Sequence, residues 1–203
     1  MIGVRAMHNL SAGSAHLAGR ILITALLCAG CRVAGATPPP GDFQLEISKQ
    51  QKQLLVLQGD QVVRRFHIAY GRGGPGQKQR LGDNKTPNGT YRIVEFKSDS
   101  QFHFFMQLDY PNPVDAWHGY RAELIDAGQF RAIAVAHSNS VVPPQDTALG
   151  GYIGIHGIGE MNEEKLDIHA HQNWTNGCIA LTNDEVTQLR EFVAIGTRVI
   201  IRE

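Results

Sequence analysis

Three strand-like runs, at residues 43–50, 53–59 and 61–71, constrain the fold of this chain more than any other feature. Each is rich in Val, Ile, Leu and Phe and short enough to be a strand. Polar residues at 49–52 and a Gly-Asp pair at 59–60 favour turns between the runs. The sequence therefore predicts an antiparallel meander at the start of the folded region.

A segment rich in glycine and proline follows at 71–88. Its glycines, with Pro75 and Pro87, exclude a long helix until an alternating strand resumes at 90–96. A phosphate-binding loop is the weaker interpretation, because no glycine motif of that kind stands between a strand and a helix.

Farther along, residues 116–130 predict one short helix, and 137–151 predict a long loop of the kind that forms a lid or a binding rim. Residues 152–157 predict a short strand that ends on a histidine. Because these elements are short, strands remain the main predicted secondary structure.

The clearest helix signal lies near the end of the chain. Thr182 and Glu185 have the spacing of a capping box, and apolar residues then recur at helical intervals. A helix is expected over about 183–192, and residues 196–203 close the chain as a strand. The predicted fold class is therefore mainly β, with a few short helices.

The first 36 residues have the layout of a signal peptide. A short apolar run at 21–29 follows Arg5 and Arg20, and a small-residue cleavage site ends at Ala36. The run is too short to span a bilayer, which needs about 20 apolar residues. We expect an exported protein of the periplasm or cell envelope, with a signal peptide at 1–36, a linker at 37–42 and one domain at 43–203.

The three cysteines carry different implications. Cys28 and Cys31 lie in the expected signal peptide; in an alternative reading as a lipoprotein signal, Cys31 would carry a lipid anchor. Either outcome leaves Cys178 as the one usable thiol. An unpaired thiol in an oxidising compartment favours a reactive role, and the alternative is a small buried apolar side chain.

Charge excludes one class of partner. The chain has 19 basic and 19 acidic side chains, and the first 36 residues contain three arginines and no acid, so the remainder has a formal net charge of −3. No large basic field for nucleic acid is present. The roughly 160 remaining residues suit one domain, and we expect a monomer.

His156 is the candidate partner of Cys178, because a cysteine nucleophile needs a base that accepts its proton. His169 and His171 are rivals, and with Cys178 they could instead bind zinc. We expect them to be solvated loop residues or to line the cleft, with no metal bound. Gly177 lets backbone amides approach a carbonyl oxygen, as in an oxyanion hole, or is a simple turn glycine.

Four segments together resemble the catalytic domains of L,D-transpeptidases. They are "IHG" at 155–157, "NWTNGCIALTNDEV" at 173–186, "GPGQKQRLGDNKTPNGTYRI" at 74–93 and "LDYPNPVDA" at 108–116. The resemblance extends over about 43–201, in the branch with a Trp-Thr-x-Gly-Cys-Ile-Ala motif. It implies a mixed β-sandwich-like fold.

The resemblance also implies a role for individual residues. Cys178 matches the nucleophile, His156 the general base and Gly157 the position that orients the histidine, while the amides near Gly177 match the oxyanion site. The same motifs imply a substrate-binding group that comprises Trp174, Thr175, Asn176 and Tyr152.

The implied substrates are peptidoglycan stem peptides, and the implied chemistry uses no metal or cofactor. The expected reaction is transpeptidation through a cysteine thioester. Two alternatives stay open: hydrolysis of stem-peptide or wall-protein linkages by the same pair, as an L,D-carboxypeptidase or amidase, and a catalytically inactive wall-binding module. Asn173 stands where the branch has an acidic residue, which leaves substrate choice open.

Overall fold

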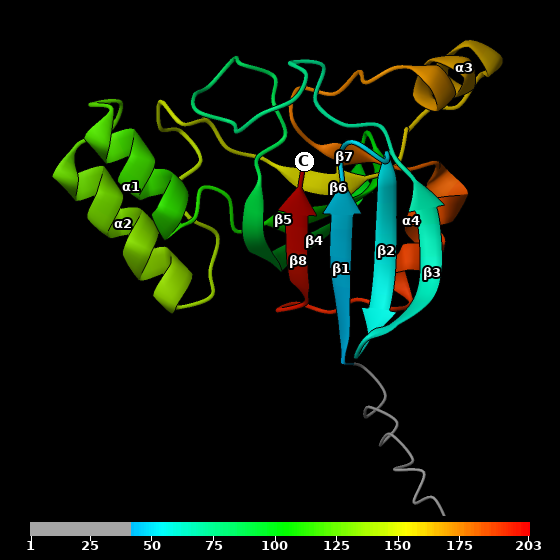
Figure 1. Ribbon diagram of the computed structural model, residues 1–203, viewed down its shortest axis with the longest axis horizontal. Coiled ribbons are helices and arrows are strands. Elements are labelled where there is room, and N and C mark those ends of the chain that lie inside the picture. Colours follow the sequence, from blue (N-terminus) through cyan, green and yellow to red (C-terminus); the bar gives the residue numbers. More distant parts are fainter. Residues whose placement is uncertain (1–41) are drawn as a thin grey trace, which may run out of the picture. The chain divides into compact units, whose positions relative to one another are not determined.

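The computed structural model describes residues 42–203 of the chain. In this part, eight strands form a sheet and four short helices lie around it (Figure 1). The predicted mainly β fold is therefore confirmed. The expected signal peptide, with Cys28 and Cys31, lies outside the described residues, as does all but the last residue of the expected linker. Between residues 42 and 203, no helix is long and apolar enough to cross a membrane.

The strands form one sheet in the order β3-β2-β1-β8-β4-β5-β6-β7. Their bounds are β1 Phe43–Ser48, β2 Gln53–Gln58, β3 Gln61–His67, β4 Gly89–Ser100, β5 His103–Leu108, β6 Gly154–His156, β7 Ile179–Ala180 and β8 Arg198–Arg202. β1, β2 and β3 pair antiparallel, which confirms the predicted meander. β8 is the predicted last strand and pairs with β1 in parallel.

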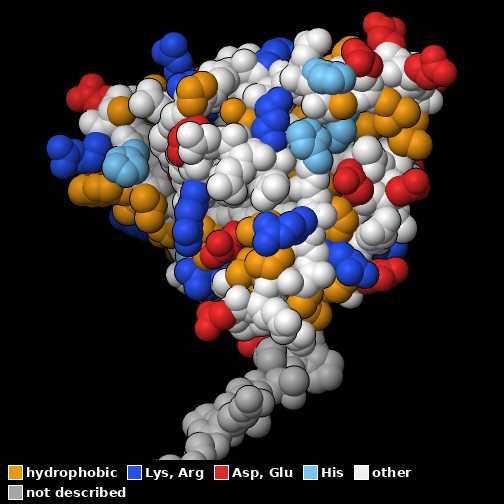
Figure 2. Space-filling model, turned by 45° about the vertical axis from the view of Figure 1, so that its right-hand side comes forward, with side chains coloured by type: hydrophobic (Ala, Val, Ile, Leu, Met, Phe, Trp, Pro, Cys, Tyr) orange, Lys and Arg blue, Asp and Glu red, His pale blue; other side chains and the backbone are white. Residues whose placement is uncertain are grey.

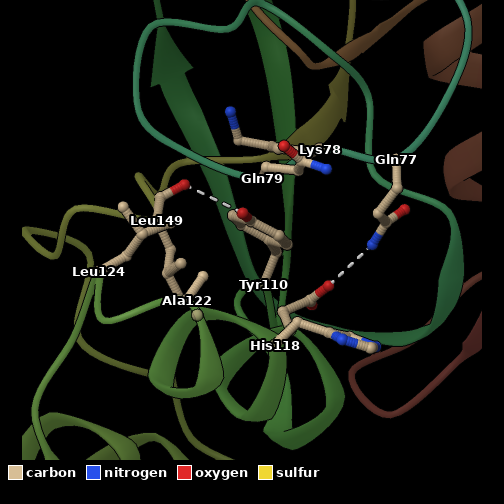
Figure 3. Close-up of a pocket in the computed structure, with 10 residues that line it drawn as sticks. Gln77, Lys78, Gln79, Tyr110, His118, Ala122, Leu124 and Leu149 are labelled. Carbon is tan, nitrogen blue, oxygen red and sulfur yellow. Dashed lines mark hydrogen bonds between the residues drawn. The ribbon is translucent and has the colours of Figure 1, made fainter.

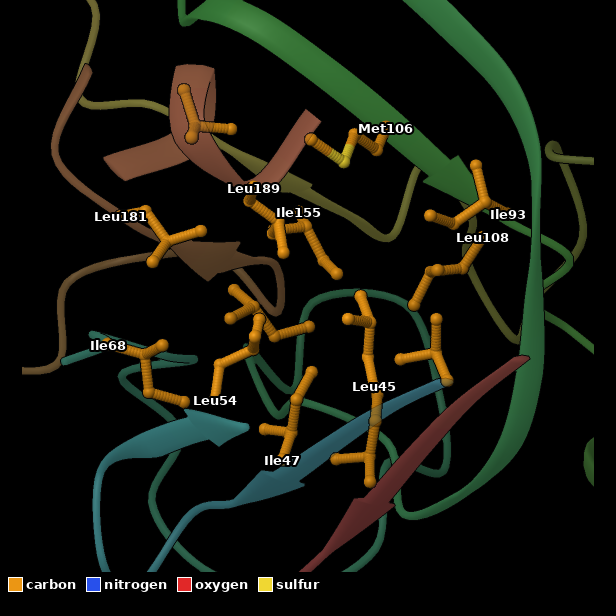
Figure 4. Packing of buried hydrophobic residues seen from close by; sticks show 14 of the residues in the cluster. Leu45, Ile47, Leu54, Ile68, Ile93, Met106, Leu108, Ile155, Leu181 and Leu189 are labelled. Carbon is orange, nitrogen blue, oxygen red and sulfur yellow. The ribbon is translucent and has the colours of Figure 1, made fainter. Parts of the chain in front are cut away.

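The two ends of this strand order are tied together. Ala69, just after β3, donates to the carbonyl of Ala180 in β7 at 3.1 Å and accepts from its N–H at 2.8 Å. The sheet therefore folds around its apolar core. Figure 4 shows Leu45 and Leu54 of the meander opposite Ile155 of β6, and all three are fully buried.

Four helices complete the described chain: α1 Pro113–Arg121, α2 Ala127–Ser138, α3 Glu163–His171 and α4 Asn183–Arg190. α4 is the predicted helix, and its capping box forms as expected between Thr182 and Glu185. Val186 and Leu189 of α4 are fully buried against the sheet.

The prediction of one short helix at 116–130 was wrong, because two helices occupy this region. Asn112 caps α1 with Asp115 in a capping box, and Asp126 caps α2 in the same way with Gln129. Between them Glu123 has a φ of 57°, which a helix cannot continue through. The predicted loop begins at Asn139 rather than at 137, because α2 runs on to Ser138.

The two helices form a hairpin with a small core of its own, which contains Ala116, Ile125, Ile133 and Leu149. Figure 1 shows α1 and α2 side by side at one end of the sheet. This hairpin occupies residues 113–138, where the sequence predicted one short helix.

The glycine-rich segment contains no helix, as predicted, and is fixed by charged groups. Asp83 accepts from the buried Lys78 ammonium at 2.7 Å and from the N–H of Gln79 at 2.7 Å. Lys49, fully buried, donates to the carbonyl of Gly76 at 2.9 Å and lies 3.0 Å from a carboxylate oxygen of Glu203. These bonds hold the segment in place without regular secondary structure.

Candidate active site

Strand pairing brings Cys178 and His156 to the same face of the sheet. β6 and β7 are parallel, with Ile155 opposite Ile179 and His156 opposite Ala180. The two isoleucines point into the core and are fully buried. Because alternate side chains of a strand share a face, Cys178 and His156 both point to the other side.

His156 is buried and held by aromatic rings. Its ring stacks on Phe102 with 4.3 Å between centroids, and Trp174 meets it edge-on at 5.9 Å. Its Nδ1 lies 2.6 Å from the carbonyl oxygen of Gly157. Burial lowers the pKa of His156 to about 4, although the bond to Gly157 opposes this shift. The imidazole is therefore neutral at neutral pH.

Cys178 is half-buried, and its thiol donates to the carbonyl of Tyr152 at 3.2 Å. Burial raises the pKa of Cys178 to about 11, against the opposing effects of the Gly154 N–H and the Lys78 charge. Within residues 42–203, no hydrogen bond joins Cys178 to His156. Such bonds often form only when substrate binds, so at rest the thiol keeps its proton.

Gly177 occupies a position that a side chain could not. Its φ is 134°, and a Cβ would lie 2.8 Å from the carbonyl oxygen of Lys85 and 2.9 Å from Ile153. Its N–H donates to the Thr175 hydroxyl at 3.2 Å, and that hydroxyl donates to the carbonyl of Cys178 at 2.7 Å. The turn before the cysteine is thus closed by Thr175, and the Gly177 amide is already engaged.

One cavity of about 680 Å³ contains both candidate catalytic side chains. All four residues of the expected substrate-binding group also line it: Trp174, Thr175, Asn176 and Tyr152. Asn176 and Tyr152 are exposed, whereas Thr175 is buried with its hydroxyl engaged. The predicted strand at 152–157 starts only at Gly154, because Tyr152 has a φ of 55°.

Sequence reasoning missed several walls of this cavity. Phe102 and Phe105 come from the β4–β5 region, and the charged side chains of Arg72, Lys97 and Asp99 also line it. None belongs to the motif around the cysteine. The aromatic run at 102–105 was the only signal available, and it reads equally well as core.

His169 and His171 do not lie where they were expected. Both belong to α3, so they are not loop residues, and neither lines the 680 Å³ cavity. His171 is exposed beside Asp167, whereas His169 is buried and accepts from the Trp174 indole at 3.4 Å. In the described part of the chain, no group of three His, Cys, Asp or Glu side chains is placed to hold a metal ion.

A second cavity, of about 520 Å³, lies between the glycine-rich segment and α1 and includes neither Cys178 nor His156. Figure 3 shows Gln77 pointing into it from one side and Tyr110 at its centre, donating to the carbonyl of Leu149. Asp115 accepts from Gln77 at 3.1 Å and from Tyr91 at 3.0 Å. Tyr110, Gln77 and Asp115 are therefore bonded within the scaffold, and this cavity is separate from the candidate active site.

Comparison with known proteins places this chain in a family. A family model described as "L,D-transpeptidase catalytic domain" matches residues 42–201. YqjB of Bacillus subtilis (strain 168) is 25% identical over 173 residues, which cover 83% of this chain and 76% of that protein. Its description as an L,D-transpeptidase is itself provisional.

Two further comparisons cover less of the other protein. YafK of Escherichia coli (strain K12), also a provisional L,D-transpeptidase, is 32% identical over 87 residues, or 40% of this chain and 35% of that protein. This chain thus matches about a third of the length of YafK. The structure of Bdellovibrio bacteriovorus Bd1075 is similar in fold, with 18% identity and a TM-score of 0.50 over 80% of this chain and 48% of that one.

Proposed function

The chain belongs to the L,D-transpeptidase catalytic domain family, and on this premise we propose that it transfers acyl groups between peptidoglycan stem peptides through a thioester on Cys178. The observation that carries the proposal is that His156, at the end of β6, and Cys178, directly before β7, line the same cavity. An inactive wall-binding module would have no reason to keep this pair.

Acylation begins with transfer of a proton. Nε2 of His156 accepts the thiol proton while the sulfur of Cys178 attacks the carbonyl carbon that follows the L-configured centre of a diamino acid. Because the pKa of the thiol is about 11 and that of the imidazole about 4, transfer and attack occur together rather than from a standing ion pair. The C–N bond then breaks, and His156 returns the proton to the departing D-amino acid.

The developing negative charge on the carbonyl oxygen needs hydrogen-bond donors. We assign the backbone amide of Cys178 to this role. The Gly177 amide can join only if it releases Thr175, to which it donates at 3.2 Å.

The second half-reaction decides between the two enzymatic candidates. An acceptor amine gives up a proton to His156, attacks the thioester and yields a cross-link or an exchanged terminal residue. If water attacks instead, the protein is an L,D-carboxypeptidase or amidase. We favour transfer, because a thioester can accept an amine and the chain belongs to the L,D-transpeptidase catalytic domain family.

Product analysis tests the proposal. Mature protein is incubated with a disaccharide tetrapeptide, with and without excess D-amino acid, and the products are identified by mass spectrometry. We expect a dimer or an exchanged terminal residue, and neither with Cys178→Ala. A tripeptide with free D-alanine would mean hydrolysis.

Failure of cleavage has two distinguishable forms. A covalent adduct between Cys178 and a carbapenem, without cleavage, would indicate another donor, such as a linkage that anchors a protein to the wall. Neither adduct nor product would favour the wall-binding module and refute the enzymatic proposal.

We also propose that the protein is exported to the periplasm or cell envelope and acts as a monomer. On the face shown in Figure 2, basic and acidic side chains are interspersed, which gives no single field for nucleic acid. N-terminal sequencing of exported protein should begin at Thr37, whereas a lipidated Cys31 would support the lipoprotein alternative. Sedimentation measures the oligomeric state.

A further inference from the structure

His169 is an unusual residue to find buried. It lies on α3 with 3% of its surface exposed, and its Nδ1 accepts from the Trp174 indole N–H at 3.4 Å. An indole nitrogen only donates, so Nδ1 holds a lone pair and the proton is on Nε2. That Nε2 is buried, and no partner for it exists among residues 42–203. A buried unpaired donor costs about 1–3 kcal/mol, so packing alone does not explain a histidine here.

The contact to Trp174 offers an explanation. One side of the indole lines the catalytic cavity and meets the His156 ring edge-on at 5.9 Å. Trp174 also lines a separate cavity of about 370 Å³, whose other walls include Phe102 and Ile168. The indole therefore borders two cavities, and its polar edge is anchored by the hydrogen bond to His169.

We propose that His169 is a positioning residue for the active site: through its hydrogen bond to Trp174, it holds the indole against His156 and so sets the orientation of the catalytic imidazole. The inference rests on the proposed function, because it assigns His156 a catalytic role. Its test does not depend on that function. His169 does not touch the reacting atoms and is therefore not a catalytic residue.

The surroundings of His169 keep this bond in place. The His67 ring of β3 lies 6.0 Å away, edge-on. Burial lowers the pKa of His169, and the charges of His67 and Lys52 act in the same direction, while Glu185 of α4 opposes them. A neutral His169 retains the lone pair that accepts from Trp174, whereas a protonated ring would have a second donor facing the indole.

The test uses alkylation of Cys178 by iodoacetamide, which needs no peptidoglycan substrate. His169→Leu removes the acceptor at similar volume, Trp174→Phe removes the donor, and His169→Gln restores an acceptor. His171→Ala, an exposed position on the same helix, is the matched control. We expect His169→Leu and Trp174→Phe each to lower the alkylation rate about tenfold. The double variant should lower it no further. His169→Gln should recover most of the rate.

A second readout follows the indole itself. The chain has two tryptophans, so a Trp117→Phe background leaves Trp174 as the reporter. His169→Leu should increase quenching of its fluorescence by acrylamide, with the melting temperature used to detect general loss of structure. Additive effects in the double variant, or a rate and quenching equal to those of His171→Ala, would overturn the inference. If the wild type shows no transpeptidation but the effects of the His169 and Trp174 substitutions remain non-additive, only the proposed function would be refuted.

Discussion

The Nδ1 atom of His156 lies 2.6 Å from the carbonyl oxygen of Gly157, its neighbour in the chain. A carbonyl oxygen only accepts, so Nδ1 carries the proton and Nε2 is left with a lone pair. Gly157 has no room for a side chain, because a Cβ there would lie 2.6 Å from Asn183 Oδ1 and 2.8 Å from the Phe102 carbonyl. Asn183 is itself fixed by two bonds to Gly159, of 3.1 and 2.7 Å. The backbone thus selects the tautomer that can act as a base.

Gly157→Ala should damage this arrangement. The added methyl group displaces the carbonyl and tilts His156, so we expect kcat to fall about tenfold or more with a smaller change in KM, and the free energy of unfolding to fall by about 1–3 kcal/mol. Steady-state kinetics and urea unfolding measure the two effects. Gly128→Ala, within α2, is the control for the kinetics and should leave kcat unchanged. Unchanged kcat in Gly157→Ala would contradict the orienting role.

Titration should reveal a neutral pair at rest. Because the pKa of Cys178 is about 11, the ultraviolet absorbance of a thiolate should appear only in strong alkali, after subtraction of the Cys178→Ala spectrum. A thiolate signal at neutral pH would contradict the mechanism, since it would indicate a standing ion pair with His156.

Acid should weaken folding through His156. Its pKa is about 4 when folded and 6.5 as a model value, so between these values the unfolded chain binds more protons. Stability is then complete above about pH 6.5 and is lost as the pH falls toward 4. Urea unfolding across this range should give a flatter profile for His156→Gln than for the wild type. Profiles of equal slope would contradict the lowered pKa.

Lys49→Ala should destabilise the fold. The substitution removes a fully buried side chain and leaves the carbonyls of Gly76 and Thr86 without their donor. We expect the free energy of unfolding, measured in urea, to fall by about 2–5 kcal/mol. Lys165→Ala, at a partly exposed lysine, should change it by less than about 0.5 kcal/mol. A similar small change for Lys49→Ala would show that the glycine-rich segment is held by other contacts.

The elements predicted well from the sequence were those with local signals. Polar turns separate the first three strands, and the capping box at Thr182 fixes the start of α4. The motif around Cys178 indicated the family and the cavity. His156 could be proposed as the base from the chemistry that a cysteine nucleophile needs. That it lies on the same face as Cys178 depends on the parallel register of β6 and β7.

The features that were missed fall into two kinds: helix starts whose local signal was not used, and contacts between distant residues. The start of α2 had a helix-start signal in the sequence that was not used, since Asp126 and Gln129 have capping-box spacing. α3 has a weaker one, because Asn162 caps it without a reciprocal partner. The burial of His169 and the stacking of Phe102 on His156 had none, because both depend on how α3 and the β4–β5 hairpin pack against the site.

Trapping of the acyl-enzyme tests the central claim most directly. The wild-type protein is mixed with a disaccharide tetrapeptide, quenched in acid, and weighed intact by mass spectrometry, with Cys178→Ala treated in parallel. We predict a mass increase equal to the substrate minus one D-alanine, mapped by peptide analysis to Cys178 and absent from Cys178→Ala. Release of D-alanine without any adduct on the wild type, or an adduct that persists in Cys178→Ala, would contradict a thioester mechanism at this residue.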